Sequence, residues 1–140
     1  MTDKKSIRDS DLVAAAAQAR GLAHAPYSHF PVGAAVLTAS GRVFTGANVE
    51  NASYGLTACA ERVAIWKAIS EGETEIAAIA VVTAGGVSPC GACRQVMAEF
   101  ASRVAGLAGV RVLVADLSGR YTAYTLDDLL PVAFTPANLI

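Results

Sequence analysis

The chain has 140 residues, enough for one domain with a core that needs no disulfides. Hydrophobic residues make up 54% and charged residues 16%, and the net charge of −1 comes without a Lys/Arg cluster, which argues against nucleic-acid binding. No apolar run reaches the roughly 18 residues that span a bilayer, and the polar segment Met1–Ser10 is unlike a signal peptide. We expect a single cytoplasmic domain over residues 1–140 that forms a homo-oligomer, because it is apolar for its size, and that binds a small ligand instead of a nucleic acid.

The first half of the chain predicts one helix and one β-hairpin. Polar capping residues precede the alanine-rich run Leu12–His24, which should end before Pro26 because the residue before proline avoids the helical region. The β-prone runs Val32–Thr38 and Val43–Val49 are separated by four residues of turn composition. Two antiparallel strands are therefore expected to follow the first helix.

The second half alternates helices and strands. Val63, Trp66 and Ile69 recur at helical spacing, which predicts a helix with these residues on its core face. In chain order the predicted elements are helix Cys59–Ser70, strand Ile76–Val82, helix Cys90–Phe100, strand Val110–Ala115, strand Tyr121–Tyr124 and a brief helix between Thr125 and Pro131. The pattern predicts an α/β fold, a three-layer αβα sandwich around a mixed five-stranded sheet.

All three cysteines stand at the starts of predicted helices. Cys59 opens one helix in the segment Cys-Ala-Glu, and Cys90 and Cys93 open another in the segment Pro-Cys-Gly-Ala-Cys. Two helices that begin at the same end of adjacent parallel strands bring their N-termini together, so the three thiols can converge. Helix N-termini lower thiol pKa values, and three thiolates suit a zinc ion whose fourth position stays open for water. We expect one catalytic Zn²⁺ per subunit.

Two residues beside Cys59 complete the predicted chemistry. Glu61 lies two positions further on, off the face of the thiol, so it should stand beside the zinc-bound water and carry protons rather than bind the metal. Three thiolates leave the metal centre net negative and a weaker Lewis acid. Arg62 is expected to donate hydrogen bonds to the sulfurs and so to withdraw charge.

Other readings of the cysteines are open. Cys90-x-x-Cys93 alone would equally suit a thioredoxin-like redox pair, although such chemistry has no use for a third cysteine with an adjacent glutamate. A structural zinc site would need a fourth ligand, and the chain's imidazoles are His24 and His29, which are more simply explained as loop or surface residues.

The two cysteine segments, with Arg94 and Gln95 after the second, resemble the zinc motifs of the cytidine deaminase family. Cys59 stands in place of the histidine of that pattern. This replacement resembles the small, three-cysteine, homotetrameric branch of the family, and the likeness runs from about Ala25 to Leu139. The resemblance implies a cytidine deaminase-like fold and zinc-dependent hydrolysis of cytidine and 2′-deoxycytidine to uridine and 2′-deoxyuridine, with release of ammonia, in pyrimidine salvage. It also implies a cytoplasmic homotetramer with active sites shared between subunits.

The resemblance further implies a set of nucleoside contacts. Two segments, 30–34 and 48–51, match those that hold the nucleoside in the family. Phe30 would pack near the pyrimidine, while Asn48 and Glu50 would hydrogen-bond the ribose 3′-hydroxyl, as an amide and a carboxylate at alternate strand positions can. The other implied contacts are the backbone at Ala60 and Ser88 and, from neighbouring subunits, the side chains of Tyr27, Tyr54 and Phe134.

Simpler roles stay open for some of these residues, since Phe30 and Phe134 could be packing aromatics and Asn48 a turn residue. Three functions compete: a nucleoside deaminase, a deaminase of another aminopyrimidine, and a zinc or interaction protein without catalysis. Asn48 and Glu50 favour the first, and a non-catalytic protein would have no use for Glu61. A polynucleotide editor would need a basic groove that this charge balance does not provide.

Overall fold

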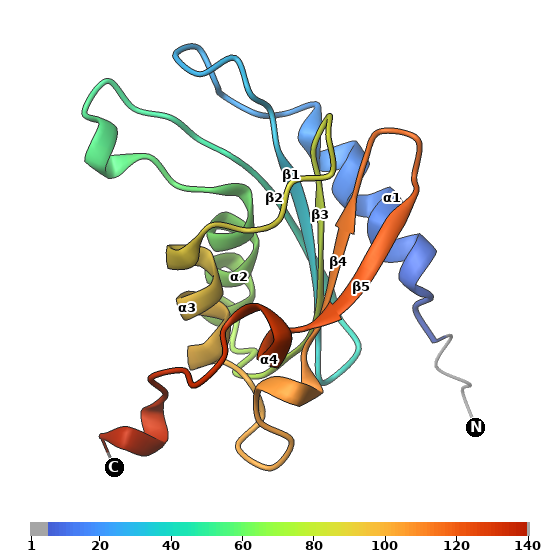
Figure 1. Ribbon diagram of the computed structural model, residues 1–140. Helices are drawn as coiled ribbons and strands as arrows, with labels where there is room; N and C mark the ends of the chain where they lie inside the picture. Colours follow the sequence, from blue (N-terminus) through green and yellow to red (C-terminus); the bar gives the residue numbers. More distant parts are fainter. Residues whose placement is uncertain (1–5, 140) are drawn as a thin grey trace.

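The structure, a computed structural model, describes residues 6–139 and contains four helices and five strands in that range (Figure 1). Residues 1–5 of the polar N-terminal segment, and residue 140, lie outside the described residues. The elements are α1 (Asp9–Arg20), β1 (Gly33–Thr38), β2 (Val43–Ala47), α2 (Ala60–Ser70), β3 (Ile76–Val82), α3 (Gly91–Glu99), β4 (Arg111–Ala115), β5 (Tyr121–Thr125) and α4 (Leu126–Leu129). Short 3₁₀ turns occupy Tyr54–Leu56, Leu107–Gly109 and Pro136–Asn138.

The five strands form one mixed sheet in the order β2-β1-β3-β4-β5. β3 and β4 are parallel, and every other neighbouring pair is antiparallel. The hairpin of β1 and β2 turns at Gly41, whose φ of 94° suits a residue without a side chain. The mixed five-stranded sheet predicted from the sequence is confirmed.

Helices cover both faces of the sheet and make three layers (Figure 1). On one face α1 buries Leu12 and Ala16 against small side chains of β1, β3 and β4. On the other face α2, α3 and α4 bury a larger cluster that includes Ile65, Met97 and Leu126 against the opposite side of the same strands. β3 and β4 are buried on both faces, as their continuous apolar runs predict.

The first helix begins and ends earlier than expected. The Asp11 carboxylate accepts a hydrogen bond from the backbone N–H of Arg8 at 3.2 Å, which closes the helix start three residues before Leu12. At the other end, the backbone N–H of His24 donates to the Asn48 carbonyl at 2.9 Å. His24 therefore pairs with the segment that follows β2 instead of continuing the helix, and the predicted end at that residue is wrong.

Two other expectations about packing are wrong. β2 and β3, which precede the two cysteine-bearing helices, are separated by β1 rather than adjacent, although their opposite pairing with β1 makes them run in the same direction. On α2 the buried face is formed by small residues and Ile65, and Trp66 is 47% exposed. The spacing predicted the helix correctly and Ile69 does pack against the core, but the buried position of Trp66 is wrong, because alanines allow the helix to lie close to the sheet.

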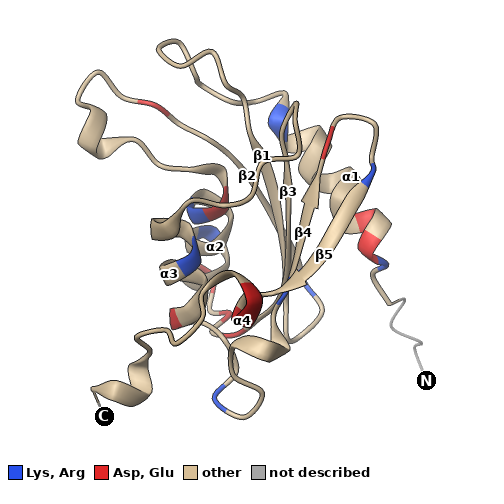
Figure 2. Cartoon of the chain, in the orientation of Figure 1, with Lys and Arg blue, Asp and Glu red and all other residues tan. Residues whose placement is uncertain are grey.

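No helix within residues 6–139 is both long and apolar enough to cross a membrane. Lys and Arg are scattered over several elements of this part of the chain, interspersed with Asp and Glu, instead of forming one stripe (Figure 2). Several of the arginines are engaged by carboxylates, as in the pairs of Arg42 with Glu71 and of Arg111 with Asp9. The surface charge is therefore locally balanced.

The close approach of α2 to β2 gives the first prediction. A Cβ added at Gly46 would lie 2.6 Å from the Ala64 nitrogen and 2.8 Å from the Ala60 oxygen, both backbone atoms of α2. Gly46→Ala should therefore lower the free energy of unfolding by about 1–3 kcal/mol or more, the usual cost of overpacking. The measurement is the urea midpoint at fixed chain concentration. Gly85→Ala, whose Cβ would meet nothing within 4 Å, is the control, and equal midpoints for the two variants would contradict the prediction.

Candidate metal and nucleoside site

The three thiols meet because two helices begin at the same place over the sheet. Cys59 and Cys90 are the N-cap residues of α2 and α3, each with extended backbone, and Cys93 lies in the first turn of α3. The three Sγ atoms all lie within 4.8 Å of one another. The convergence predicted from the sequence is confirmed, even though the strands leading to the two helices are not neighbours.

The chemistry of this cluster fits zinc. Sulfur ligands around one point are the donor set that Zn²⁺ prefers, and in residues 6–139 neither histidine joins the group. Three protein ligands leave a coordination position for water or substrate. The Cys59 pKa is lowered to about 5, first by the hydrogen bond from the Cys93 thiol and then by Arg62, while the same hydrogen bond raises the pKa of Cys93. One thiolate is thus favoured at neutral pH by the protein alone.

Arg62 lies against the cluster as expected. Its Nη2 donates to Cys59 Sγ at 3.2 Å, and the guanidinium carbon lies 5.9 Å from the centre of the Trp66 ring. The buried Nε of Arg62 meets no partner within the described residues. The half-exposed Trp66 therefore covers a cation that is directed at a thiolate sulfur.

Glu61 is a buried carboxyl at the same helix start. Its side chain is 4% exposed, and this burial raises its pKa above the ordinary value. The nearby Cys59 thiolate adds to the rise, whereas a hydrogen bond with Cys93 opposes it. The raised pKa makes the Glu61 carboxylate a better proton acceptor than an exposed glutamate.

A pocket with a volume near 290 Å³ opens over these groups. Its walls include Cys59, Cys90 and Glu61 together with most of the residues that the family resemblance assigns to nucleoside binding. The assigned residues in its lining are Phe30, Asn48, Glu50, Ala60 and Ser88. One concave site therefore combines two of the three thiols, a buried carboxyl and an aromatic side chain.

The Asn48 amide is already engaged within the protein. Its Oδ1 accepts from the Val32 nitrogen and its Nδ2 donates to the Phe30 oxygen, each at 2.9 Å, and the residue is 7% exposed. Asn48 and Glu50 lie just past β2, which ends at Ala47 rather than at Val49 as expected. A main role of Asn48 is therefore to hold the segment that carries Phe30, with one amide hydrogen left for another partner.

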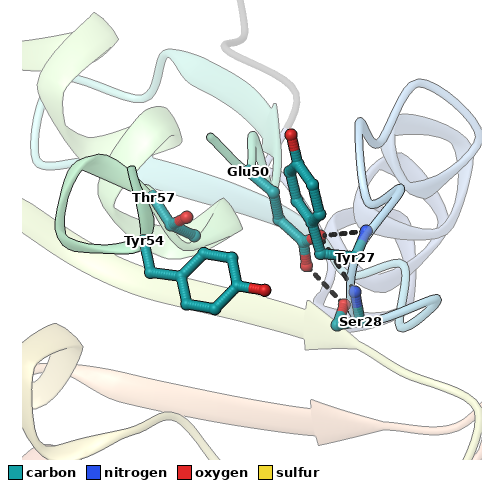
Figure 3. A pocket seen from close by; sticks show the side chains of 5 residues that line it. All are labelled: Tyr27, Ser28, Glu50, Tyr54 and Thr57. Carbon is teal, nitrogen blue, oxygen red and sulfur yellow. Dashed lines mark hydrogen bonds between the residues drawn. The ribbon is translucent and has the colours of Figure 1, made fainter. Parts of the chain in front are cut away.

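The three residues expected to serve neighbouring subunits lie outside this pocket. Tyr27 and Tyr54 make a T-shaped ring contact with centroids 5.7 Å apart and line an adjoining hollow with Ser28, Glu50 and Thr57 (Figure 3). Phe134 lies near the C-terminus, is 58% exposed, and is tied to α3 through its backbone oxygen, which accepts from Gln95 Nε2 at 2.7 Å. Their contacts to another subunit's site stay a prediction.

Two residues in the site were not singled out from the sequence. Arg94 donates to the Pro89 and Leu129 oxygens at 2.8 and 2.7 Å and to Ser88 Oγ at 3.0 Å, which ties the start of α3 to the end of α4. Ser28 contacts Glu50 from the loop before β1. Arg94 stands in the quoted cysteine segment, but its partners are backbone carbonyls that no motif reveals.

Comparisons with known proteins agree with this geometry. The sequence profile of the family described as "Cytidine and deoxycytidylate deaminase zinc-binding region" matches residues 6–106. A cytidine deaminase of Halalkalibacterium halodurans is 52% identical over 130 residues, 91% of this chain and 95% of that protein. One of Mycobacterium tuberculosis is 46% identical over 121 residues, 85% and 84% of the two chains. The solved cytidine deaminase of Burkholderia pseudomallei superposes with a TM-score of 0.83 at 47% identity, covering 91% of this chain and 99% of that one.

The chain thus carries a zinc-binding deaminase domain, and its three-cysteine cluster fits the metal of that class of hydrolytic enzymes. Within the class, it belongs to the cytidine deaminase family. A redox role for Cys90 and Cys93 as an isolated pair is disfavoured, because the third thiol lies within the same cluster.

The geometry predicts the metal content of a cysteine variant. Cys93 is the buried member of the cluster, so Cys93→Ser should reduce bound zinc to less than about a tenth of one ion per chain. The measurement is elemental analysis after dialysis. Ala92→Ser introduces the same hydroxyl at an exposed position of the same helical turn and should keep its zinc. Full zinc occupancy in both variants would show that the metal binds elsewhere.

Proposed function

We propose that this protein hydrolyses cytidine and 2′-deoxycytidine to uridine and 2′-deoxyuridine with release of ammonia, and that it serves pyrimidine salvage in the cytoplasm. One observation carries the proposal: a single pocket is lined both by Glu61 with two of the thiols, Cys59 and Cys90, and by the predicted nucleoside contacts Phe30, Asn48 and Glu50. The family and the names of its relatives support the same substrate class. Three free thiols suit a reducing compartment, which supports the cytoplasm.

Cys59, Cys90 and Cys93 would hold the zinc ion. When bound, zinc supplies Lewis acidity that makes water a better nucleophile at neutral pH. The reaction forms a C–O bond at C4 of the pyrimidine and breaks the C–N bond, so the oxygen of water ends on the ring and the amine leaves as ammonia. The proton balance requires a group that takes the two protons of water in turn and passes one to the ring nitrogen and the other to the departing amine.

Glu61 is the group we assign to that transfer. It lines the pocket beside two of the thiols, and its burial keeps bulk water from competing for the proton. The backbone at Ala60, the first residue of α2, and at Ser88 would meet the polar edge of the base. Arg94 would keep Ser88 in place through its hydrogen bond to the Ser88 hydroxyl.

The sugar end of the pocket supports a nucleoside substrate. Phe30 presents an aromatic ring suited to packing near the pyrimidine, and Glu50 presents a carboxylate suited to a ribose hydroxyl. The spare amide hydrogen of Asn48 would donate to the same hydroxyl. The scattered basic residues in Figure 2 support a free nucleoside rather than a polynucleotide.

A homotetramer with shared active sites completes the proposal. Large apolar side chains are exposed over the described surface, among them Tyr27, Tyr54, Trp66 and Phe134. Phe134 lies outside the pocket of its own chain and is exposed, so it is free to reach over a neighbour's base. Tyr27 and Tyr54 border the pocket at its sugar end. From there they could also contact the active site of a neighbouring subunit.

The main test replaces Glu61 with its uncharged isostere. Glu61→Gln should lower kcat for ammonia release from cytidine by about 10²- to 10⁴-fold, because proton transfer through a side chain contributes that much. Zinc content must equal that of the unaltered protein. The same assay is run with 2′-deoxycytidine. An unaltered, zinc-replete protein that releases no ammonia from either nucleoside would contradict the substrate assignment, whereas full activity of the variant would contradict the role of Glu61.

Arg62→Ala separates charge withdrawal from metal binding. Loss of the hydrogen bond to Cys59 should lower kcat about 10- to 100-fold, as removal of groups that support metal ligands does, while the zinc content is kept. Lys67→Ala, one turn further along the same helix, removes a positive charge that contacts the Thr45 carbonyl instead of a thiol. An unchanged rate for Arg62→Ala would exclude the proposed role.

A further inference from the structure

The Glu50 carboxylate is held by the loop that precedes β1. Oε1 accepts hydrogen bonds from the backbone N–H groups of Tyr27 and Ser28 at 3.0 and 3.1 Å, and Oε2 accepts one from the Ser28 hydroxyl (Figure 3). Three donors from two successive residues thus converge on one side chain. Glu50 is an anchor for the loop as well as part of the pocket wall.

The Ser28 hydroxyl also contacts the residue that carries the aromatic ring of the pocket. Its oxygen accepts a hydrogen bond from the backbone N–H of Phe30 at 3.0 Å. A hydroxyl has one proton, and because this oxygen is the acceptor from Phe30, its proton is available to Glu50. Ser28 therefore joins the backbone of Phe30 to the carboxylate of Glu50 in one directed chain of hydrogen bonds.

The loop that carries Ser28 has a backbone conformation that needs support. His29 has a φ of 55°, a region that residues other than glycine seldom adopt, and its N–H donates to the Ala25 oxygen at 3.0 Å. Such conformations persist where surrounding contacts hold them. The bonds to Glu50 and from Phe30 flank His29 on both sides and provide that hold.

The hydrogen-bond inventory leaves one place for a ligand. An ionised carboxylate has about four acceptor sites, and within residues 6–139 two on Oε1 and one on Oε2 of Glu50 are used. The remaining site lies on Oε2, the oxygen that Ser28 holds. The orientation in which a ribose hydroxyl can donate to Glu50 is therefore set by Ser28.

We infer that Ser28 is a positioning residue for the sugar end of the substrate: it orients the Glu50 carboxylate toward the ribose 3′-hydroxyl and fixes it relative to Phe30. The inference rests on the proposed function, since it assigns how that site recognises its nucleoside. Ser28 does not take part in proton transfer. Its removal should weaken binding of the sugar and leave the chemistry at the pyrimidine largely intact.

The kinetic test compares two substrates that differ at one hydroxyl. With cytidine, Ser28→Ala should lower kcat/KM about tenfold, mostly through KM, the effect of losing one hydrogen bond to a charged group. With 3′-deoxycytidine, which lacks the hydroxyl that Glu50 would bind, the same variant should lose less than about twofold relative to the unaltered protein. Ser28→Thr, which keeps the hydroxyl, should restore most of the activity on cytidine.

A titration of the substrate-free protein tests the hydrogen bond between the Ser28 hydroxyl and the Glu50 carboxylate. The Ser28 hydroxyl is the largest cause of the lowered pKa of Glu50, and the backbone bonds and His24 add to it. Carbon NMR of labelled glutamates should therefore show a higher Glu50 pKa in Ser28→Ala than in the unaltered protein. Both proteins keep histidine at position 24. Ser53→Ala removes another exposed serine hydroxyl, one outside this network, and should change neither the pKa nor the kinetics.

The outcomes separate this inference from the function on which it rests. Equal losses on cytidine and 3′-deoxycytidine, or a Glu50 pKa that does not move in Ser28→Ala, would overturn the positioning role while the deaminase assignment stands. An unaltered protein that releases no ammonia from cytidine would overturn the proposed function and the substrate part of the inference. A loss confined to cytidine, together with a raised Glu50 pKa, supports both.

Discussion

The site depends on two helix N-termini that point at one place over the sheet. Each helix start leaves backbone N–H groups without intrahelical partners and carries partial positive charge, and each has a cysteine at its N-cap position. The two helix starts that gather the three thiols are also electropositive, a surrounding that favours a thiolate such as that of Cys59. Gly46 of β2 makes the position of α2 possible, because the backbone of α2 lies so close to Gly46 that a Cβ there would have no room.

Most elements of the fold could be predicted from periodicity and capping, and the misses have physical causes. The spacing of Trp66 predicts a core position, because large apolar side chains usually define a buried face, yet α2 buries alanines and thus comes close to the sheet. The sequence predicts His24 within the first helix, because Pro26 is the residue that marks the helix end. Its backbone is instead paired with Asn48 and Glu50, residues more than twenty positions away, and such long-range pairing leaves no local pattern.

At the site, the meeting of the three thiols could be predicted and the scaffold around them could not. Cysteines with narrow chemistry and fixed spacing give a strong local signal, and the three thiols do meet. Ser28 and Arg94 gave no comparable signal, because serine and arginine are common and their contacts span loops and separate elements. The family resemblance assigns Asn48 to the sugar, yet its side-chain amide makes two hydrogen bonds to the backbone of the segment that carries Phe30.

The contacts of Arg94 also bear on how freely this site can change during evolution. Two of its partners are the main-chain oxygens of Pro89 and Leu129, which every amino acid provides. Substitutions at position 129 can therefore accumulate without removing the acceptor, provided that α4 keeps its course. The guanidinium has no such substitute, since no other side chain has five donors in one rigid plane. Substitutions are thus tolerated at the residues whose backbone oxygens accept these hydrogen bonds, whereas selection should oppose replacement of Arg94, which donates them.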